Sequence, residues 1–331
     1  MLFTLLACDA GRPEPIEPAD SGAESIPWQV VSKDMPGSFL SVWGAAADDV
    51  YVVGADAGGG PEAWHFDGLA WTPVDGLGSG DLWWVSGDAS RVWTAGIGGR
   101  VFRVDRATAE VDAWVLDDTK TFFGVWGPGD GTAWAAGGDT ELSGGAAVLW
   151  HFDGANWAPA ELPSELASQY ALFKVWGSAG DDVWTVGSEG VSGHWDGTRW
   201  TWIDTGAQTN LYTVNDGYAV GGSSAGTILR LSESGTAWVD ESPDLAVQIF
   251  GVFGGAAPVA VGTRGSVWHR DDGEWVPDAR ALPTLHDLHS TWVDPDGGVW
   301  AAGGHFASTP MTQGTLVYSG TASIAGVPAV E

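Results

Sequence analysis

A tryptophan recurs along this chain at a nearly constant interval. Successive members of the series are 43 residues apart at first, and then 38 and 37 residues apart: Trp28, Trp71, Trp114, Trp157, Trp200, Trp238 and Trp275. One residue type that returns about every 40 residues is typical of a repeat array, in which each copy is one supersecondary unit. The interval therefore constrains the fold before any other feature is considered.

Each copy contains short apolar runs that are separated by glycine or by Asp-Gly. One copy has Val-Trp-Gly at 175–177, Asp-Val-Trp-Thr-Val-Gly at 182–187 and His-Trp-Asp-Gly at 194–197. The glycine that closes the second run occurs seven times, at Gly54, Gly96, Gly137, Gly187, Gly221, Gly262 and Gly303. Short runs rich in Val, Trp and Phe predict strands, and Asp-Gly between two of them predicts a hairpin. No segment shows the 3.6-residue apolar period of a helix.

The repeats predict an all-β, seven-bladed β-propeller with four antiparallel strands in each blade. Four-stranded units of about 40 residues that stack radially form this architecture. A linear stack of the same strands would leave two exposed edges that attract incorrect pairing, whereas a closed ring has none.

The point of ring closure is predicted from the last copy. That copy has strands near 288–293, 298–303 and 314–318, but no tryptophan follows Trp300. The missing member of the series is Trp28, at the other end of the chain. We expect residues 28–31 to form the outer strand of the last blade and to close the ring. The alternative is that residues 322–327 supply this strand.

Copies of this form resemble the Trp- and Gly-rich β-propeller repeat proteins of myxobacteria and their relatives, many of which look like secreted or lipid-anchored proteins. The resemblance covers about residues 28–320, and it departs most at 214–217 and 318–320. It implies the propeller fold and an extracytoplasmic location. It implies no activity, because none is common to the group.

The N-terminus resembles a bacterial lipoprotein signal. The sole cysteine, Cys8, follows Leu5-Leu6-Ala7, as in a lipobox, although the apolar run is short and no Lys or Arg precedes it. We expect residues 1–8 to be a truncated export signal with lipidation at Cys8, and 9–26 to be a flexible Pro-, Glu- and Asp-rich tether. Residues 27–331 would form the propeller. The alternative is a chance cysteine in a disordered tail.

The charge balance bears on location and partners. The chain has 43 acidic and 13 basic residues, a net charge of −30. Such a charge repels nucleic acid and anionic membrane surfaces. No apolar run is long enough to span a membrane, so membrane contact is expected only through a lipid at Cys8. We therefore expect a monomer in the cell envelope, periplasmic or at the cell surface, with an unknown protein or glycan partner.

The common catalytic and metal-binding patterns are scarce. The repeated histidines occupy equivalent places in different blades and are expected to be structural: His65, His151, His194 and His269. Paired Cys-x-x-Cys, His-Glu-x-x-His, phosphate-loop and Gly-x-Ser-x-Gly patterns do not occur. Asp294-Pro-Asp-Gly-Gly298 is similar to half of a calcium loop but lacks the later ligands, and a turn is the expected structure. We predict no catalytic residue, cofactor or metal.

Candidate ligand-binding residues come from the loops in which the copies differ. Loops are enlarged at 139–145, 161–170 and 305–313, on the face where propeller sites gather at the channel mouth. The candidates are Asp139, Glu141, Glu165, Tyr170, His305 and Phe306, with Arg264 and Lys120 as cationic partners. The alternative is ordinary variation of loop sequence.

Three functional hypotheses remain open from the sequence. The first is a protein-binding or scaffolding module without catalysis. The second is a lectin, in which tryptophans outside the shared positions stack on sugars: Trp83, Trp84, Trp195 and Trp202. The third is a propeller hydrolase, lyase or quinone-dependent dehydrogenase, which would place His305 close to Glu141 or Asp139.

Overall fold

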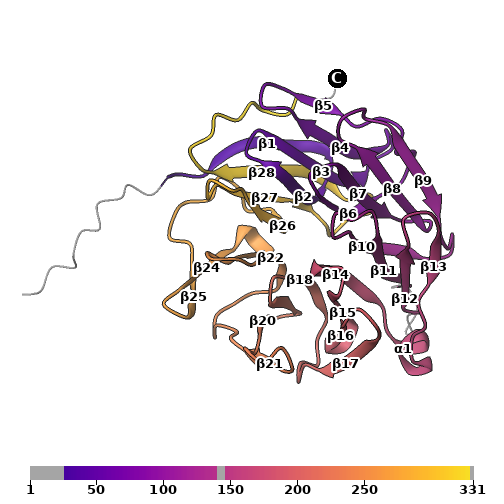
Figure 1. Ribbon diagram of the computed structural model, residues 1–331. Coiled ribbons are helices and arrows are strands. Elements are labelled where there is room, and N and C mark those ends of the chain that lie inside the picture. The colour runs from indigo at the N-terminus through magenta and orange to yellow at the C-terminus, as the bar shows by residue number, and fades with distance from the viewer. Residues whose placement is uncertain (1–25, 140–145, 329–331) are drawn as a thin grey trace, which may run out of the picture.

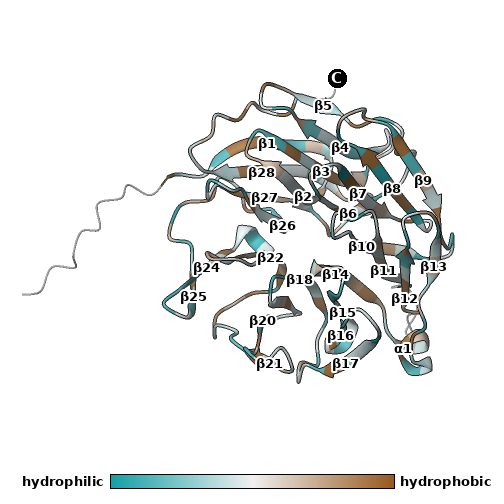
Figure 2. Cartoon of the chain, in the orientation of Figure 1, coloured by the Kyte–Doolittle hydropathy of each residue, from teal (hydrophilic) through white to brown (hydrophobic). Residues whose placement is uncertain are grey.

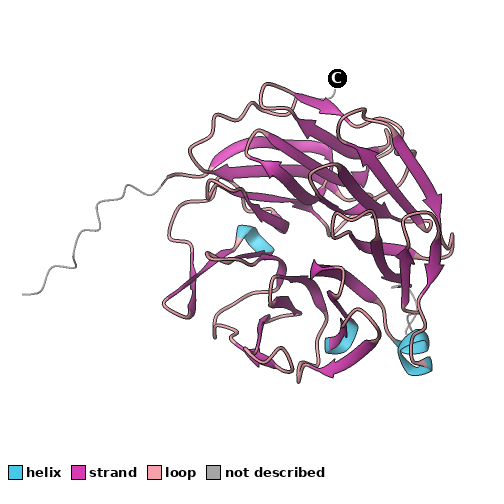
Figure 3. Cartoon of the chain, viewed as in Figure 1, coloured by secondary structure: helices cyan, strands magenta, loops and turns pink. Residues whose placement is uncertain are grey.

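Seven four-stranded antiparallel sheets stand around a central axis (Figures 1 and 3). The computed structural model describes residues 26–139 and 146–328. The predicted seven-bladed β-propeller is confirmed. The predictions for residues 1–8, the lipidation of Cys8, nearly all of the tether, and Glu141 lie outside the described residues. Within the described ranges, no helix is both long and apolar enough to cross a membrane.

In the first six blades the four strands follow chain order from the innermost outward. The first blade contains β2 (Phe39–Ala46), β3 (Asp49–Asp56), β4 (Pro61–Phe66) and β5 (Trp71–Pro73). The second contains β6 (Leu82–Gly87), β7 (Arg91–Gly96), β8 (Arg100–Asp105) and β9 (Val111–Val115). The third contains β10 (Thr121–Trp126), β11 (Ala133–Gly138), β12 (Val148–Phe152) and β13 (Trp157–Pro159). Hydrophobic and hydrophilic residues alternate along the outer strands (Figure 2), because successive side chains point to opposite faces of a sheet.

The next three blades follow the same pattern. The fourth contains β14 (Leu172–Ala179), β15 (Asp182–Gly187), β16 (Val191–Trp195) and β17 (Trp200–Asp204). The fifth contains β18 (Leu211–Asn215), β19 (Tyr218–Gly222), β20 (Gly226–Leu231) and β21 (Trp238–Asp240). The sixth contains β22 (Ile249–Phe253), β23 (Val259–Gly262), β24 (Val267–Asp271) and β25 (Glu274–Pro277). Single 3₁₀ turns, η1 (Ser188–Gly190) and η2 (Thr263–Gly265), follow β15 and β23.

The seventh blade joins both ends of the described chain, as predicted. It consists of β26 (Asp287–Val293), β27 (Val299–His305), β28 (Thr312–Ser319) and, as the outer strand, β1 (Gln29–Gly37). In Figure 1 the indigo β1 lies along the yellow β28. Residues 322–327 do not pair as a strand; they pack on the adjoining core, where Trp71 Nε1 donates to the Ala325 carbonyl at 2.8 Å.

A partly buried polar cluster fixes the start of β1. Trp28 Nε1 donates to Asp278 Oδ2 at 3.0 Å, and the Arg280 guanidinium donates to the Ile26 carbonyl at 2.9 Å. Arg280 also donates to Asp278, and lies 5.2 Å from the Trp28 ring centroid. These hydrogen bonds hold the pKa of Asp278 well below its ordinary value, against the opposing effect of burial. The cluster therefore attaches the N-terminal strand to the sixth blade as well as the seventh.

The recurring tryptophans fill the seams between blades. Five of the seven pack on an aromatic residue in the second strand of the preceding blade, at ring-centroid distances of 5.2 to 6.3 Å: Trp71 on Trp300, Trp157 on Trp93, Trp200 on Trp134, Trp238 on Trp184 and Trp275 on Tyr218. Trp28 packs on Val259 and Val261 of the preceding blade, and Trp114 lies 6.0 Å from Trp93 of its own blade. Large flat side chains supply most of the apolar burial at such seams. The 43-residue interval is thus the interval between seams.

The glycine of Val-Trp-Gly provides room for the tryptophan of the neighbouring blade. A Cβ at Gly44 would lie 2.6 Å from Trp292, and one at Gly177 would lie 2.8 Å from Trp126. Gly87, in a Val-Ser-Gly variant of the same segment, is equally close to Trp43, at 2.6 Å. A side chain at this position would force neighbouring blades apart. The same pair of residues is therefore needed in successive copies.

One predicted loop contains a short helix. Residues 161–170 were expected to be a loop, but α1 (Ser164–Gln169) lies within them, at the outer edge of the ring (Figure 1). A helix of six residues is too short to show an apolar period in the sequence.

The repeated histidines lie in four separate blades and pack locally. His65 stacks on Tyr51 at 4.0 Å and bonds to Asp49 at 2.9 Å; His194 stacks on Trp184 at 4.2 Å. The Asp294–Gly298 segment is a tight turn in which Asp294 Oδ1 accepts the backbone N–H of Gly298. Among the described residues, no group of three or more His, Cys, Asp or Glu side chains is placed to hold a metal ion.

Candidate functional site

Every innermost strand has a bulge near its start, at the second residue in five blades and at the third in the other two. The register between the first and second strands skips one residue in each blade: Leu40, Trp83, Phe123, Phe173, Tyr212, Phe250 and His289. A bulge re-aims a side chain and is common beside functional sites. Here seven bulges place seven side chains around one opening.

The recurring strand glycine stands directly beside this bulge. A Cβ on any of the seven would lie 1.8 to 2.2 Å from a backbone carbonyl oxygen at the start of the first strand. Only glycine permits this approach of two backbones. The residue that marks the repeat in the sequence therefore also shapes the channel mouth.

Six of the seven bulge residues form a closed ring of aromatic contacts. The ring-centroid distances between successive members, from Trp83 through Phe123, Phe173, Tyr212, Phe250 and His289 back to Trp83, are 5.3, 5.6, 5.7, 5.5, 5.9 and 5.9 Å. These distances are those of favourable aromatic pairs. We call this feature, with its floor, the aromatic bowl.

The aromatic bowl encloses an open cavity of about 340 Å³. Phe306 and Met311, from the enlarged loop between β27 and β28, overhang it, and Phe306 lies 5.6 Å from the His289 ring. The cavity opens on the face that carries the connections between second and third strands. Apolar pockets of this size with a few polar groups are the usual form of ligand sites.

The floor of the bowl carries a buried lysine. Lys174 follows the bulge residue Phe173 and is only 2% exposed. Its Nζ donates to the Phe123 carbonyl at 2.8 Å and lies 3.3 Å from the centroid of the Trp84 ring. Burial lowers the pKa of Lys174 well below its ordinary value. Gly124 leaves space for it, since a Cβ there would lie 2.9 Å from Lys174 Cα.

His289 has a defined tautomer in the bowl. Its Nδ1 lies 2.6 Å from the Leu40 carbonyl oxygen, which can only accept, so Nδ1 carries the proton. The neutral ring therefore keeps its lone pair at Nε2. Burial, together with the charge of Lys174, lowers the pKa of His289 to about 4, while the bond to Leu40 opposes this shift.

Two further polar side chains line the bowl, Tyr212 and Asn210. Gln248 donates its amide N–H to the Tyr212 hydroxyl at 3.0 Å, which leaves the hydroxyl proton of Tyr212 to donate elsewhere. No Asp or Glu is among the described residues that line the cavity. The bowl thus offers an apolar wall with an amine, an imidazole, a hydroxyl and an amide.

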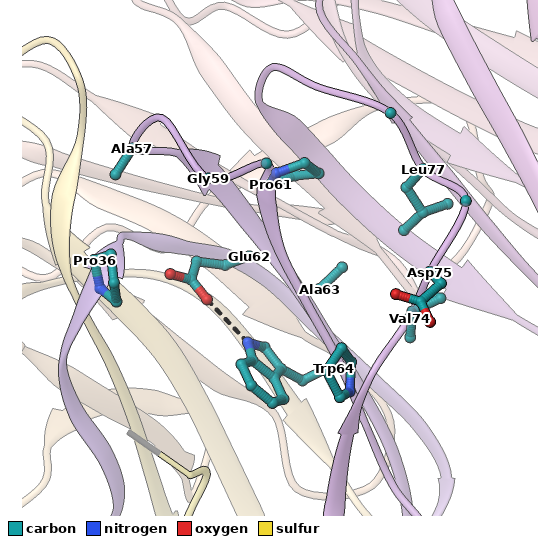
Figure 4. A pocket seen from close by; sticks show the side chains of 14 residues that line it. Pro36, Ala57, Gly59, Pro61, Glu62, Ala63, Trp64, Val74, Asp75 and Leu77 are labelled. Atoms are coloured by element: carbon teal, nitrogen blue, oxygen red, sulfur yellow. Dashed lines mark hydrogen bonds between the residues drawn. The ribbon is translucent and has the colours of Figure 1, made fainter. Parts of the chain in front are cut away.

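A second cavity, of about 360 Å³, lies against the first blade and has a structural explanation (Figure 4). Its buried carboxylate, Glu62, accepts the Trp64 indole N–H at 2.9 Å and the Gly37 backbone N–H at 2.9 Å. Both oxygens are used, and they fix the end of β1 to the first blade. The opposite end of the channel holds a smaller cavity of about 170 Å³, lined in part by Trp43, Trp126, Trp176 and Trp292.

The residues proposed from the sequence are mostly separate from the bowl. Phe306 lines it, and His305 is the exposed residue beside Phe306 that ends β27. Glu165 and Tyr170 belong to α1 and its C-terminal cap at the outer edge. Arg264, Lys120 and Asp139 are described but do not line the cavity. Ligand binding by any of them stays a prediction.

The tryptophans proposed as a sugar platform are divided between two places. Trp83 and Trp84 lie on β6 at the channel, whereas Trp195 and Trp202 lie on β16 and β17 and, partly buried, pack against the core between the third and fourth blades. They do not form one stacking surface. Only Trp83 has a place in the aromatic bowl.

Sequence reasoning missed most of the bowl, and above all Lys174. The position that follows each bulge is Ser, Thr or Gly in five copies, namely Ser41, Gly124, Thr213, Gly251 and Ser290. Trp84 and Lys174 are the exceptions. Lys174, which replaces a small residue within an apolar strand, is the feature of the sequence that could have indicated this site.

Comparisons with known proteins support the fold and no closer relationship. No protein-family model matches the chain, and no curated protein matches it. Its structure is similar to the WD40 β-propeller domain of Doa1, at 13% identity and TM-score 0.63, covering 90% of this chain and 99% of that one. It is also similar to streptogramin B lyase, at 11% identity and TM-score 0.65, covering 88% of this chain and 97% of that one. A third similar structure is YCF48 from Cyanidioschyzon merolae, at 13% identity and TM-score 0.65, covering 88% of this chain and 98% of that one. Such low identities show the fold alone.

Proposed function

We propose that this propeller is a lipid-anchored binding module outside the cytoplasm, and that its aromatic bowl receives an apolar group of a partner protein. The closed ring of six aromatic side chains around a cavity of about 340 Å³ carries the proposal. A cavity lined in this way buries one large apolar side chain, and buried apolar anchors supply most of the energy of protein interfaces.

The composition of the bowl favours an apolar side chain over a sugar. Sugars need many hydrogen bonds, and the lining supplies few polar groups: Lys174, Asn210, Tyr212 and His289. The fold does not decide between binding and catalysis, since propellers serve both. The solved neighbours illustrate this, because one of them is named as a lyase.

Binding in the bowl is expected to depend on its aromatic wall. In calorimetric titrations with 2-naphthylmethanol, a probe of an apolar aromatic group, Trp83→Ala and Phe250→Ala should each bind about tenfold more weakly than the unchanged protein. The loss of one aromatic contact and its buried area is worth roughly 1 kcal/mol or more. Trp202→Ala, on β17, is the matched control and should bind normally. Equal affinities in all four proteins would refute the bowl as the site.

The lipid anchor is proposed from the resemblance of residues 5–8 to a lipobox and of the repeats to myxobacterial propellers. Expressed in a bacterium behind a complete signal, the chain should incorporate an alkynyl fatty acid and sediment with membranes. Cys8→Ala should lose the label and no longer sediment with membranes, because the proposal attaches the chain to the membrane through the lipid on Cys8. Retention of the label by Cys8→Ala would rule out this anchor.

A further inference from the structure

Lys174 is the buried ionisable group that the packing of the ring does not explain. Five of the other six innermost strands use Ser, Thr or Gly at this position, and the sixth has Trp84. Thr213 satisfies its hydroxyl with one bond to the Phe250 carbonyl at 2.8 Å. A lysine at this position costs side-chain entropy and desolvation that the small residues avoid. Because Lys174 lies at the floor of an open cavity, we consider a role for its amine in binding a ligand there.

Burial of Nζ disfavours the charged form of Lys174. Among the described residues, no carboxylate forms an ion pair with Lys174. The contacts of Nζ with the Phe123 carbonyl and the Trp84 ring stabilise an ammonium group, whereas burial beneath a cavity walled by aromatic side chains opposes it. Desolvation disfavours the ammonium form, which agrees with the lowered pKa of Lys174. A neutral amine is a nucleophile at neutral pH, whereas an ordinary exposed lysine is almost wholly protonated.

We propose that Lys174 forms a reversible imine with an aldehyde or ketone whose apolar body occupies the aromatic bowl. This inference rests on the proposed function, because it requires that the bowl bind an apolar group. It adds the chemical class of the ligand, namely a carbonyl compound with an aromatic or branched aliphatic body. It also adds the atom with which that ligand reacts.

The reaction balances without any further reactant. The Nζ lone pair attacks the carbonyl carbon, a C–N bond forms, and the carbonyl oxygen takes up a proton to give a carbinolamine. Loss of that hydroxyl as water, with the remaining proton of the nitrogen, gives the C=N bond. Hydrolysis reverses each step, so the bound compound is released unchanged.

The bowl holds groups suited to these proton transfers. His289 lines it with an unprotonated Nε2, and Tyr212 lines it with a hydroxyl proton that its bond from Gln248 leaves free. Both side chains come from bulge positions, so the backbone fixes their place around the opening.

The chain provides its own controls, because it has three lysines in all: Lys33, Lys120 and Lys174. Lys33 is exposed and Lys120 is half-buried. Incubation of the full chain with 2-naphthaldehyde and cyanoborohydride at pH 7 converts any imine into a stable secondary amine. Peptide mapping by mass spectrometry then gives the labelling rate at each lysine and at the α-amino group.

We expect Lys174 to be labelled at least about tenfold faster than Lys33 or Lys120, since each unit by which the pKa is lowered gives tenfold more free amine. An excess of 2-naphthylmethanol, which fills the bowl but has no carbonyl, should suppress labelling at Lys174 alone. Lys174→Met should lose the fast label and still bind 2-naphthylmethanol, while Lys120→Met should react as the unchanged protein does.

The outcomes separate this inference from the proposed function. Binding of 2-naphthylmethanol without faster labelling of Lys174 overturns the imine and leaves the bowl as a binding site. Absence of both overturns both. The peptide map of the unchanged protein tests imine formation at Lys174 even if Lys174→Met fails to fold.

Discussion

Removal of β1 is expected to abolish the cooperative unfolding of this protein. A chain that begins at Ser38 keeps only three strands in the seventh blade and exposes the edge of β28. It also loses the buried side chains of Trp28, Val31 and Met35, which are 7%, 4% and 4% exposed. Burial of such side chains is worth roughly 1.5–3 kcal/mol each. Their sum approaches the total stability of an ordinary domain, about 5–15 kcal/mol.

Thermal and urea unfolding, followed by near-ultraviolet circular dichroism, measures this effect. The matched control is a circular permutant in which residues 26–37 follow residue 320 through a short linker. The distance favours such a connection, because Ser319 Oγ donates to the Ile26 carbonyl at 2.9 Å. The permutant should unfold cooperatively, as residues 26–320 do. If the truncated chain keeps an unchanged midpoint, closure of the ring does not depend on β1.

The fold could be predicted from the sequence because the repeat has a geometric cause. The tryptophan interval is the interval between blade seams, and the strand glycine is required by a backbone contact at every first strand. The absence of a tryptophan after Trp300 located the strand that comes from the other end. Patterns imposed by packing recur in each copy, so one sequence contains several independent observations of them.

The candidate site could not be predicted in the same way. A site at the axis is composed of one residue from each blade, and those residues are about 40 positions apart in the sequence. Phe123 and Phe250 look like ordinary strand residues until the bulge turns them into the channel. The search for enlarged loops found Phe306, whose loop overhangs the axis, but it also selected Glu165, which lies at the outer edge. Loop length alone does not reveal the distance from the axis.

The stability of the ring is expected to fall with pH in a window set by His289. Its pKa is lowered from 6.5 to about 4 by burial and, where Lys174 is in its ammonium form, by the charge of that group. Between these values the unfolded chain binds more protons than the folded chain, so the folded state loses stability as the pH falls. The contribution is complete above 6.5 and amounts to roughly 3 kcal/mol, because one unit of pKa is worth about 1.4 kcal/mol.

His289→Phe isolates this effect, since phenylalanine occurs at the same position in three other blades: Phe123, Phe173 and Phe250. Free energies of unfolding in urea are compared at pH 7 and pH 4.5. The carboxylates and Lys174 are present in both proteins, so their titration enters both free energies and only the effect of His289 and its coupling to Lys174 remains in the difference. We expect the unchanged protein to lose roughly 2–3 kcal/mol more than His289→Phe over this interval. Equal losses of free energy of unfolding in the two proteins would mean that His289 is protonated in the folded protein as readily as in the unfolded chain. The bowl would then solvate a charged imidazole despite its aromatic wall.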